Sequence, residues 1–143
     1  MGTLSVYLDA SVLVALFTDD PFADRADTAF RARATSLLIS DFAAAEFSSS
    51  IARHVRMDEL TCQEARVVFS DFDAWTQRAV ARVETQSTDV RTAEAILRRL
   101  DTALRTPDVL HIAIAQRVGA ELATFDEKMA AAARALGTRL AAI

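Results

Sequence analysis

Short apolar runs alternate with longer segments whose apolar residues recur at helical spacing. The first run, Leu4–Leu8, holds β-forming residues and ends at Asp9, which predicts a buried strand. Similar runs bounded by polar residues recur along the chain. The expected strands are Leu4–Leu8, Ser36–Ser40, Ala79–Thr85, Glu121–Thr124 and Thr138–Ile143.

The segments between these runs predict helices, several of which carry start and stop signals. Asp20-Pro21 combines a good N-cap with a residue suited to the first helical turn, and Phe22, Ala26 and Phe30 follow at core spacing. Further helices are expected over Phe42–Arg56, after a capping box that begins at Thr61, through Val90, Ala93, Leu97 and Leu100, from an N-cap at Thr106 to Gly119, and over Glu127–Leu136.

Strands that alternate with helices predict an α/β fold, here an α/β/α sandwich with a short, mainly parallel sheet. We find no repeat and no linker, so the chain is expected to form one domain over residues 1–143. Ligands of such folds bind beyond the carboxyl ends of the strands. The residues that directly follow each strand are therefore the first place to look for chemistry.

Composition narrows the class of protein. The chain is 52% hydrophobic with only 3 Gly and 2 Pro, which excludes collagen-like and disordered chains. One Cys and two His argue against a disulfide framework and a cysteine-based zinc site. The longest apolar run, Val12–Phe17, is far too short to span a bilayer, and the N-terminus lacks a basic signal region. We expect a soluble cytoplasmic protein with no membrane contact.

The charge balance excludes a protein that coats duplex DNA by charge alone. The net charge is −4, so any contact with nucleic acid must use local patches. Almost every basic residue is arginine, whose planar fork suits phosphate. The leading candidates for phosphate contact are Arg98, Arg99 and Arg105, although an exposed, solvated face explains them equally well.

Four carboxylates stand where strands end or helices begin. Asp9 follows the first strand, Asp126 follows the Glu121–Thr124 strand, Asp108 lies in a first helical turn, and Glu46 lies one turn into a helix. Taken singly, the acids of first turns are explained by the helix dipole, and Glu46 by a solvated face. Asp9 is harder to dismiss, because it stands between two apolar runs where an unpaired carboxylate is costly.

Taken together, the four acids predict a cation site. Clustered carboxylates repel one another unless a cation compensates, and hard oxygen ligands select Mg²⁺ or Mn²⁺. Such an ion orients a phosphodiester and activates water. Ser11 and Thr124 stand near the same rim as supporting hydroxyls, with helix capping as the alternative.

The residues around these acids resemble a known family. Asp9-Ala10-Ser11 after an apolar strand, SDFAAAEFSSSIARHV around Glu46, LRTPDVLHIAIA around Asp108 and ATFDEKM around Asp126 resemble the PIN domain, in particular VapC-type toxins of bacterial toxin–antitoxin pairs. The resemblance runs from the first strand to the last.

The resemblance implies a function. It implies a Mg²⁺- or Mn²⁺-dependent endoribonuclease acting on RNA of the tRNA or rRNA class, a homodimer, and a VapB-type antitoxin that inserts a basic side chain into the acidic pocket. It further implies that Asp9 and Asp108 bind metal directly and that Glu46 and Asp126 bind a second ion or position water. Ser11 and Thr124 match supporting positions.

Three alternatives stay open. A phosphatase with Asp9 as nucleophile is disfavoured, because the usual second acid is replaced by Ser11. A non-catalytic module that binds a basic peptide and a housekeeping PIN nuclease both fit the sequence. His111 invites a general-base role, but a buried histidine that supports another side chain is the favoured interpretation.

Overall fold

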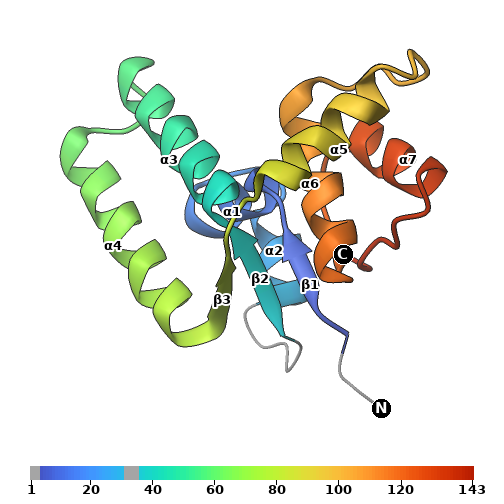
Figure 1. Ribbon diagram of the computed structural model, residues 1–143. Helices are drawn as coiled ribbons and strands as arrows, with labels where there is room; N and C mark the ends of the chain where they lie inside the picture. Colours follow the sequence, from blue (N-terminus) through green and yellow to red (C-terminus); the bar gives the residue numbers. More distant parts are fainter. Residues whose placement is uncertain (1–3, 31–35) are drawn as a thin grey trace.

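Four parallel strands form the central sheet, in the order β3-β2-β1-β4 (Figure 1). The computed structural model describes residues 4–30 and 36–143. The strands are β1 (Val6–Leu8), β2 (Leu37–Ser40), β3 (Val80–Val83) and β4 (Glu121–Ala123). The helices are α1 (Ala10–Phe17), α2 (Ala23–Phe30), α3 (Asp41–Arg56), α4 (Cys62–Ala79), α5 (Ser87–Leu97), α6 (Thr106–Val118) and α7 (Glu127–Ala135).

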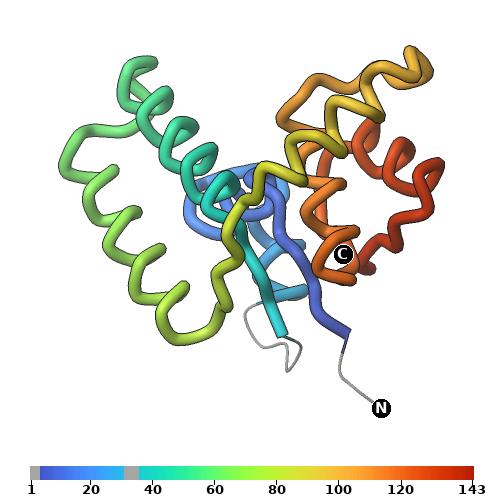
Figure 2. The backbone as a smooth tube through the Cα atoms, in the orientation of Figure 1, coloured from blue at the N-terminus to red at the C-terminus, as the bar shows by residue number. Residues whose placement is uncertain are grey.

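Both faces of the sheet are buried along β1, β2 and β4, as is usual for a parallel sheet, while the edge strand β3 is partly exposed. Successive side chains of β1 point to opposite faces: Val6 and Leu8 pack in one core cluster and Tyr7 in another. The first cluster lies under α1–α4 and the second under α6 and α7. The α3–α4 hairpin and the α5–α7 group consequently project to the two sides of the sheet (Figures 1 and 2).

Aromatic side chains hold the α3–α4 hairpin against α1. The ring of Phe17 on α1 meets the rings of Phe47, Phe72 and Trp75 edge to face, with centroids 5.4–5.8 Å apart. At the start of α4, the Thr61 hydroxyl accepts from the Glu64 amide while the Glu64 carboxylate accepts from the Thr61 amide. The expected capping box is therefore confirmed.

Most expected elements are present with shifted ends. The expected Ala79–Thr85 strand is β3, and the helix expected to stop at Gly119 does so, with Gly119 in the left-handed region at φ 69°. The N-cap of this helix is Arg105, so the expectation of a cap at Thr106 is wrong. Proline nevertheless lies in its first turn, where the missing amide costs nothing.

Three expectations about burial and strands are wrong. The Thr138–Ile143 run makes only an isolated parallel bridge between Leu140 and Leu122, and is not a strand. Phe22 lies before α2 and is 37% exposed, and Leu100 lies beyond α5 and is 90% exposed. Apolar spacing continued past the true helix ends in both cases, because periodicity alone does not mark where a helix stops.

The strand order creates a switch point between β1 and β4. From β1 the chain moves first to β2 on one side and only later returns to β4 on the other. A crevice opens at the carboxyl ends of two such strands, because the connections leave them in opposite directions. No helix within the described ranges has the length and apolar character that crossing a bilayer requires.

Candidate functional site

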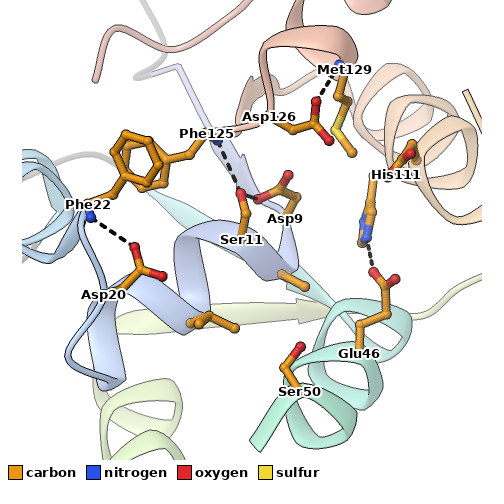
Figure 3. A pocket seen from close by; sticks show the side chains of 13 residues that line it. Asp9, Ser11, Asp20, Phe22, Glu46, Ser50, His111, Phe125, Asp126 and Met129 are labelled. Carbon is orange, nitrogen blue, oxygen red and sulfur yellow. Dashed lines mark hydrogen bonds and ion pairs between the residues drawn. The ribbon is translucent and has the colours of Figure 1, made fainter. Parts of the chain in front are cut away.

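Asp9 occupies the carboxyl end of β1 and is the N-cap of α1. Its carboxylate accepts hydrogen bonds from the Val12 amide at 3.1 Å and from Ser11 Oγ at 2.6 Å. Ser11 Oγ in turn accepts from the amide of Phe125 at 3.1 Å, across the crevice from the turn after β4. One hydroxyl thus links the ends of both switch-point strands, and Figure 3 shows it between them.

Asp9 is almost completely buried, with 2% of its surface exposed. Burial raises the pKa of its carboxyl group, while hydrogen bonds from Ser11 and Thr124 act in the opposite direction. The carboxylate is therefore held in place by neutral donors that only partly offset its loss of hydration. A cation in the pocket would supply the missing stabilisation.

Asp126 caps α7 on the other side of the crevice. Its Oδ1 accepts from the amides of Lys128 at 2.9 Å and Met129 at 3.1 Å, and its own amide donates to Thr124 Oγ1 at 3.0 Å. Asp126, expected in a first helical turn, is the N-cap itself and lines the pocket, whereas Thr124 does not cap α7 and is buried beside it. Capping therefore fixes the position of Asp126 without removing it from the site.

Glu46 reaches the site from α3, and a buried relay of hydrogen bonds holds it. His111 Nε2 is hydrogen-bonded to the Glu46 carboxylate (Figure 3). His111 Nδ1 lies 2.6 Å from Tyr7 Oη, which lies 2.7 Å from Ser40 Oγ. With His111 only 1% exposed, the structure confirms a buried, supporting histidine.

Asp108 lies in the first turn of α6, where the helix dipole favours a carboxylate. Its pKa is nevertheless raised, first by burial and then by repulsion from Asp126, Glu46 and Asp9. His111 acts in the opposite direction. The other three carboxylates are thus close enough to act on Asp108 electrostatically, as the positions of the four acids in the sequence predicted.

One pocket of about 470 Å³ collects these groups. Its lining includes five carboxylates: Asp9, Asp20, Glu46, Asp108 and Asp126. Within the described part of the chain, no arginine or lysine lines it, and His111 is its single basic side chain. No group of three or more His, Cys, Asp or Glu among residues 4–30 and 36–143 is close-set enough to hold a metal ion by itself. An ion here would keep several waters, which is usual for Mg²⁺.

The three arginines proposed for phosphate contact are not part of this lining. Arg98 pairs with Glu94 at 3.4 Å and Arg99 with Asp101 at 3.0 Å, all on exposed surface around the end of α5. Arg105 is the exposed N-cap of α6, three residues before Asp108. Their contact with RNA stays a prediction.

Several residues of the pocket lining gave no functional signal in the sequence. The expected N-cap at Asp20 is wrong, because α2 begins only at Ala23; the Asp20 carboxylate accepts from the Phe22 amide at 2.8 Å and lines the pocket. Phe22 and Phe125 line it as a stacked pair. Tyr7, the one tyrosine of the chain, gave a signal, because a tyrosine within an apolar strand needs a partner for its hydroxyl.

Both the sequence and the fold of this chain are similar to those of known proteins. The PIN domain family model matches residues 6–135. Ribonuclease VapC46 of Mycobacterium tuberculosis is 30% identical over 138 residues that cover 93% of each chain. Among solved structures, the Sarcin-Ricin loop cleaving toxin VapC20 of the same species superposes with a TM-score of 0.72 at 17% identity, covering 89% of this chain and 94% of that one. VapBC2 of Rickettsia felis, solved bound to a promoter DNA fragment, has a TM-score of 0.69 at 13% identity, covering 96% and 98%.

Proposed function

We propose a function on one premise, that this chain belongs to the PIN domain family. The protein is a divalent-metal-dependent endoribonuclease, and it acts as the toxin of a VapBC-type toxin–antitoxin pair. Its substrate is RNA of the tRNA or rRNA class. The similarity to a VapC ribonuclease over nearly the whole chain supports this activity.

A single observation carries the proposal. Four carboxylates from four separate elements, Asp9, Glu46, Asp108 and Asp126, face one pocket at the switch point of a parallel sheet. Burial, and after it repulsion from the other three carboxylates, raises the pKa of Asp108, and no arginine or lysine of the described residues lines the pocket to offset this. An arrangement that costs stability in the empty protein is expected where a bound cation repays that cost.

The donor set fits Mg²⁺ or Mn²⁺, since every charged acid of the lining offers hard carboxylate oxygens and His111 Nε2 is already bonded to Glu46. We assign Asp9 and Asp108 as direct ligands. When bound, the ion polarises the phosphodiester and favours ionisation of a water. Glu46 and Asp126 hold a second ion or orient the attacking water.

The remaining residues hold these carboxylates in place. Ser11 and Thr124 donate to Asp9 and limit its rotation. His111 fixes the direction of the Glu46 carboxylate, and the amides at the start of α7 fix that of Asp126. Asp9, Glu46 and Asp126 therefore face the pocket with little freedom left to lose, which lowers the entropic part of the barrier.

We further propose a homodimer and a VapB-type antitoxin as partners. An acidic pocket lined by no arginine or lysine, so far as the structure describes the chain, attracts an arginine or lysine supplied from outside. An antitoxin side chain placed there would neutralise the carboxylates and block the ion. A neighbouring gene for a DNA-binding protein with a basic tail would favour the toxin over a housekeeping nuclease.

The direct test is cleavage of total cellular RNA by purified protein as Mg²⁺ or Mn²⁺ is titrated. We expect cleavage that requires the ion and that falls on the order of 100-fold or more in Asp108→Asn. Asp71→Asn, an exposed acid on α4, is the matched control and should cleave normally.

Two outcomes would contradict the proposal. Full cleavage by both Asp9→Asn and Asp108→Asn would show that these two carboxylates are not needed for catalysis. Folded, antitoxin-free protein that binds a basic antitoxin peptide but cleaves no RNA at any metal concentration would instead support a non-catalytic binding module.

A further inference from the structure

An aromatic pair forms one side of the acidic pocket. The rings of Phe22 and Phe125 are stacked face to face, with centroids 4.7 Å apart and planes within 5° of parallel. Both residues line the pocket that holds Asp9 and Asp126, on the side opposite Glu46 and His111 (Figure 3). An aromatic surface therefore borders the carboxylates directly.

The two rings are layered from the core outward. Phe125 is half-buried and packs on the core cluster around α1, while Phe22 is 37% exposed. The inner ring supports the outer one, and the Asp20 carboxylate fixes the backbone at Phe22 through the hydrogen bond to its amide. The solvent-facing ring is thus rigid, although a large exposed aromatic side chain costs stability.

Arg25 lies beside the pair and covers neither ring's outer face. Its guanidinium carbon is 5.4 Å from the Phe22 centroid and 5.3 Å from the Phe125 centroid. Near-equal distances to two parallel rings place the charge at their edges. One of its nitrogens also donates to the main-chain oxygen of Ile143 at 2.9 Å, which holds it there. Within the described part of the chain Phe22 is 37% exposed, and Arg25 does not block its outer face against stacking by another flat group.

The charge of the pocket favours such a group for RNA binding. The net charge is −4 and the pocket is lined by carboxylates, so attraction of phosphates into the pocket itself depends on a bound ion. Stacking of bases on aromatic rings is the main source of affinity that does not depend on charge. It requires a base that is not paired in a duplex.

We propose that Phe22, backed by Phe125, is a stacking site for one unpaired nucleobase next to the scissile phosphate. This inference rests on the proposed function and narrows its substrate to RNA with a single-stranded or splayed nucleotide at the cleavage site. Arg25 supplies positive charge at the edge of this site for the phosphate of the stacked nucleotide.

The test measures RNA binding in the cleavage-impaired Asp108→Asn parent, with Mg²⁺ present. The probes are a labelled hexamer of uridylate, one of adenylate, and an abasic hexamer of the same charge. Adding Phe22→Ala should weaken binding of the base-bearing hexamers about 5- to 100-fold and leave the abasic hexamer unchanged. Phe22→Trp should restore binding, because it restores the ring. Val67→Ala, an exposed apolar position on α4, is the control and should bind as the parent does.

Phe22→Trp also gives a direct readout of stacking. The native Trp75 is 4% exposed and is not expected to respond, so fluorescence quenched by base-bearing hexamers reports position 22. Equal affinity of the parent and Phe22→Ala, or equal quenching by abasic and base-bearing hexamers, would overturn the inference. If the wild type cleaves RNA in that case, the proposed nuclease function stands without the stacking site. A parent that binds no hexamer overturns the stacking site, and the wild-type cleavage assay then decides whether the nuclease fails with it.

Discussion

His111 on α6 is hydrogen-bonded through Nε2 to the carboxylate of Glu46 on α3, although 65 positions separate them in the chain. The other ring nitrogen faces Tyr7 of β1 at 2.6 Å. A single imidazole therefore links a pocket carboxylate to the centre of the sheet. Because both ring nitrogens are engaged, rotation of the ring would break both contacts at once.

The first prediction concerns this relay. Tyr7→Phe keeps the ring but removes the hydroxyl shared by His111 and Ser40. Two buried groups lose a partner, so we expect a loss of about 1–2 kcal/mol in the free energy of unfolding, measured by urea denaturation. His111→Ala also leaves a cavity and should cost about 2–4 kcal/mol.

Activity separates positioning from stability in these variants. His111→Ala should lower kcat well below the wild-type value at temperatures where it remains folded, because Glu46 loses its fixed direction. His111→Gln, which can still donate toward Glu46, should recover part of kcat. Unchanged kcat in folded His111→Ala would show that Glu46 needs no such support.

The second prediction is a pH dependence. Burial raises the pKa of Asp9 above its ordinary value of 3.8, so the folded protein holds that proton more tightly than the unfolded chain does. The stability this group contributes is full below about pH 3.8 and is lost as pH rises through the raised pKa. Asp9→Asn, which still caps α1, should therefore be more stable than wild type at neutral pH in the presence of a chelator. The difference should shrink as pH falls toward 4.

Glu64 provides a control of opposite sign. Hydrogen bonds from Thr61 lower its pKa below the ordinary value of 4.5, so Glu64 contributes stability above that pH and loses it on acidification. Glu64→Gln should be less stable than wild type at neutral pH. Thermal unfolding across a pH series measures both variants, and an Asp9→Asn protein less stable than wild type at pH 7 would refute the burial argument.

The third prediction concerns the hydroxyl that joins β1 to the turn after β4. Ser11→Ala removes the donor to Asp9 and leaves the Phe125 amide without its partner. We expect kcat to fall about 10-fold at saturating Mg²⁺, equivalent to one lost hydrogen bond in the transition state. Ser11→Thr keeps the hydroxyl and should stay close to wild type. Equal kcat in the wild type and both variants would show that Ser11 serves only the structure at the start of α1.

The fourth prediction concerns an ion pair away from the site. Arg117 on α6 donates to both carboxylate oxygens of Asp89 on α5, at 2.7 and 3.0 Å, and Asp89 is 2% exposed. Arg117→Met leaves that carboxylate buried without its ionic partner, with the Gln86 amide as its remaining donor among the described contacts. The expected loss is about 2–3 kcal/mol, below the range for fully enclosed pairs because 27% of the Arg117 side chain is exposed.

Arg98 provides the matched control for this pair. Its contact with Glu94 is long and exposed, so Arg98→Ala should change the free energy of unfolding by less than about 0.5 kcal/mol. Arg117→Lys should recover little, because an ammonium cannot donate to both oxygens in the planar geometry of arginine. If Arg117→Met lost no more free energy of unfolding than Arg98→Ala does, Asp89 would have to be hydrated in solution.

Much of the fold was predictable because its signals are local. The run of β-forming residues over Leu4–Leu8 and the capping box at Thr61 depend on residues close together in the chain. The candidate acids were predictable for a related reason. Parallel strands end at a common edge, so Asp9 and Asp126 had to lie near each other once their strands were assigned.

Local pattern also produced the errors. The apolar residues after Gly137 read as a strand, but only Leu140 bridges β4. Spacing placed Phe22 on the buried stripe of a helix, whereas the chain turns at Asp20 and leaves that ring on the surface. Whether the segment after Gly137 pairs as a strand, and whether the Phe22 ring is buried, depends on which elements pack beside them more than on their own residue types.

The sequence by itself determined the α/β class, the parallel strands, the capping box at Thr61 and the four acids, since propensity, periodicity and chain order act over short distances. Only the tertiary structure decided that His111 holds Glu46 through a relay from Tyr7, that Phe22 stacks on Phe125, and that Arg117 pairs with Asp89. These contacts join residues 28 to 104 positions apart. They exist because packing seven helices onto two faces of one sheet, in the described part of the chain, leaves each buried polar group few possible partners.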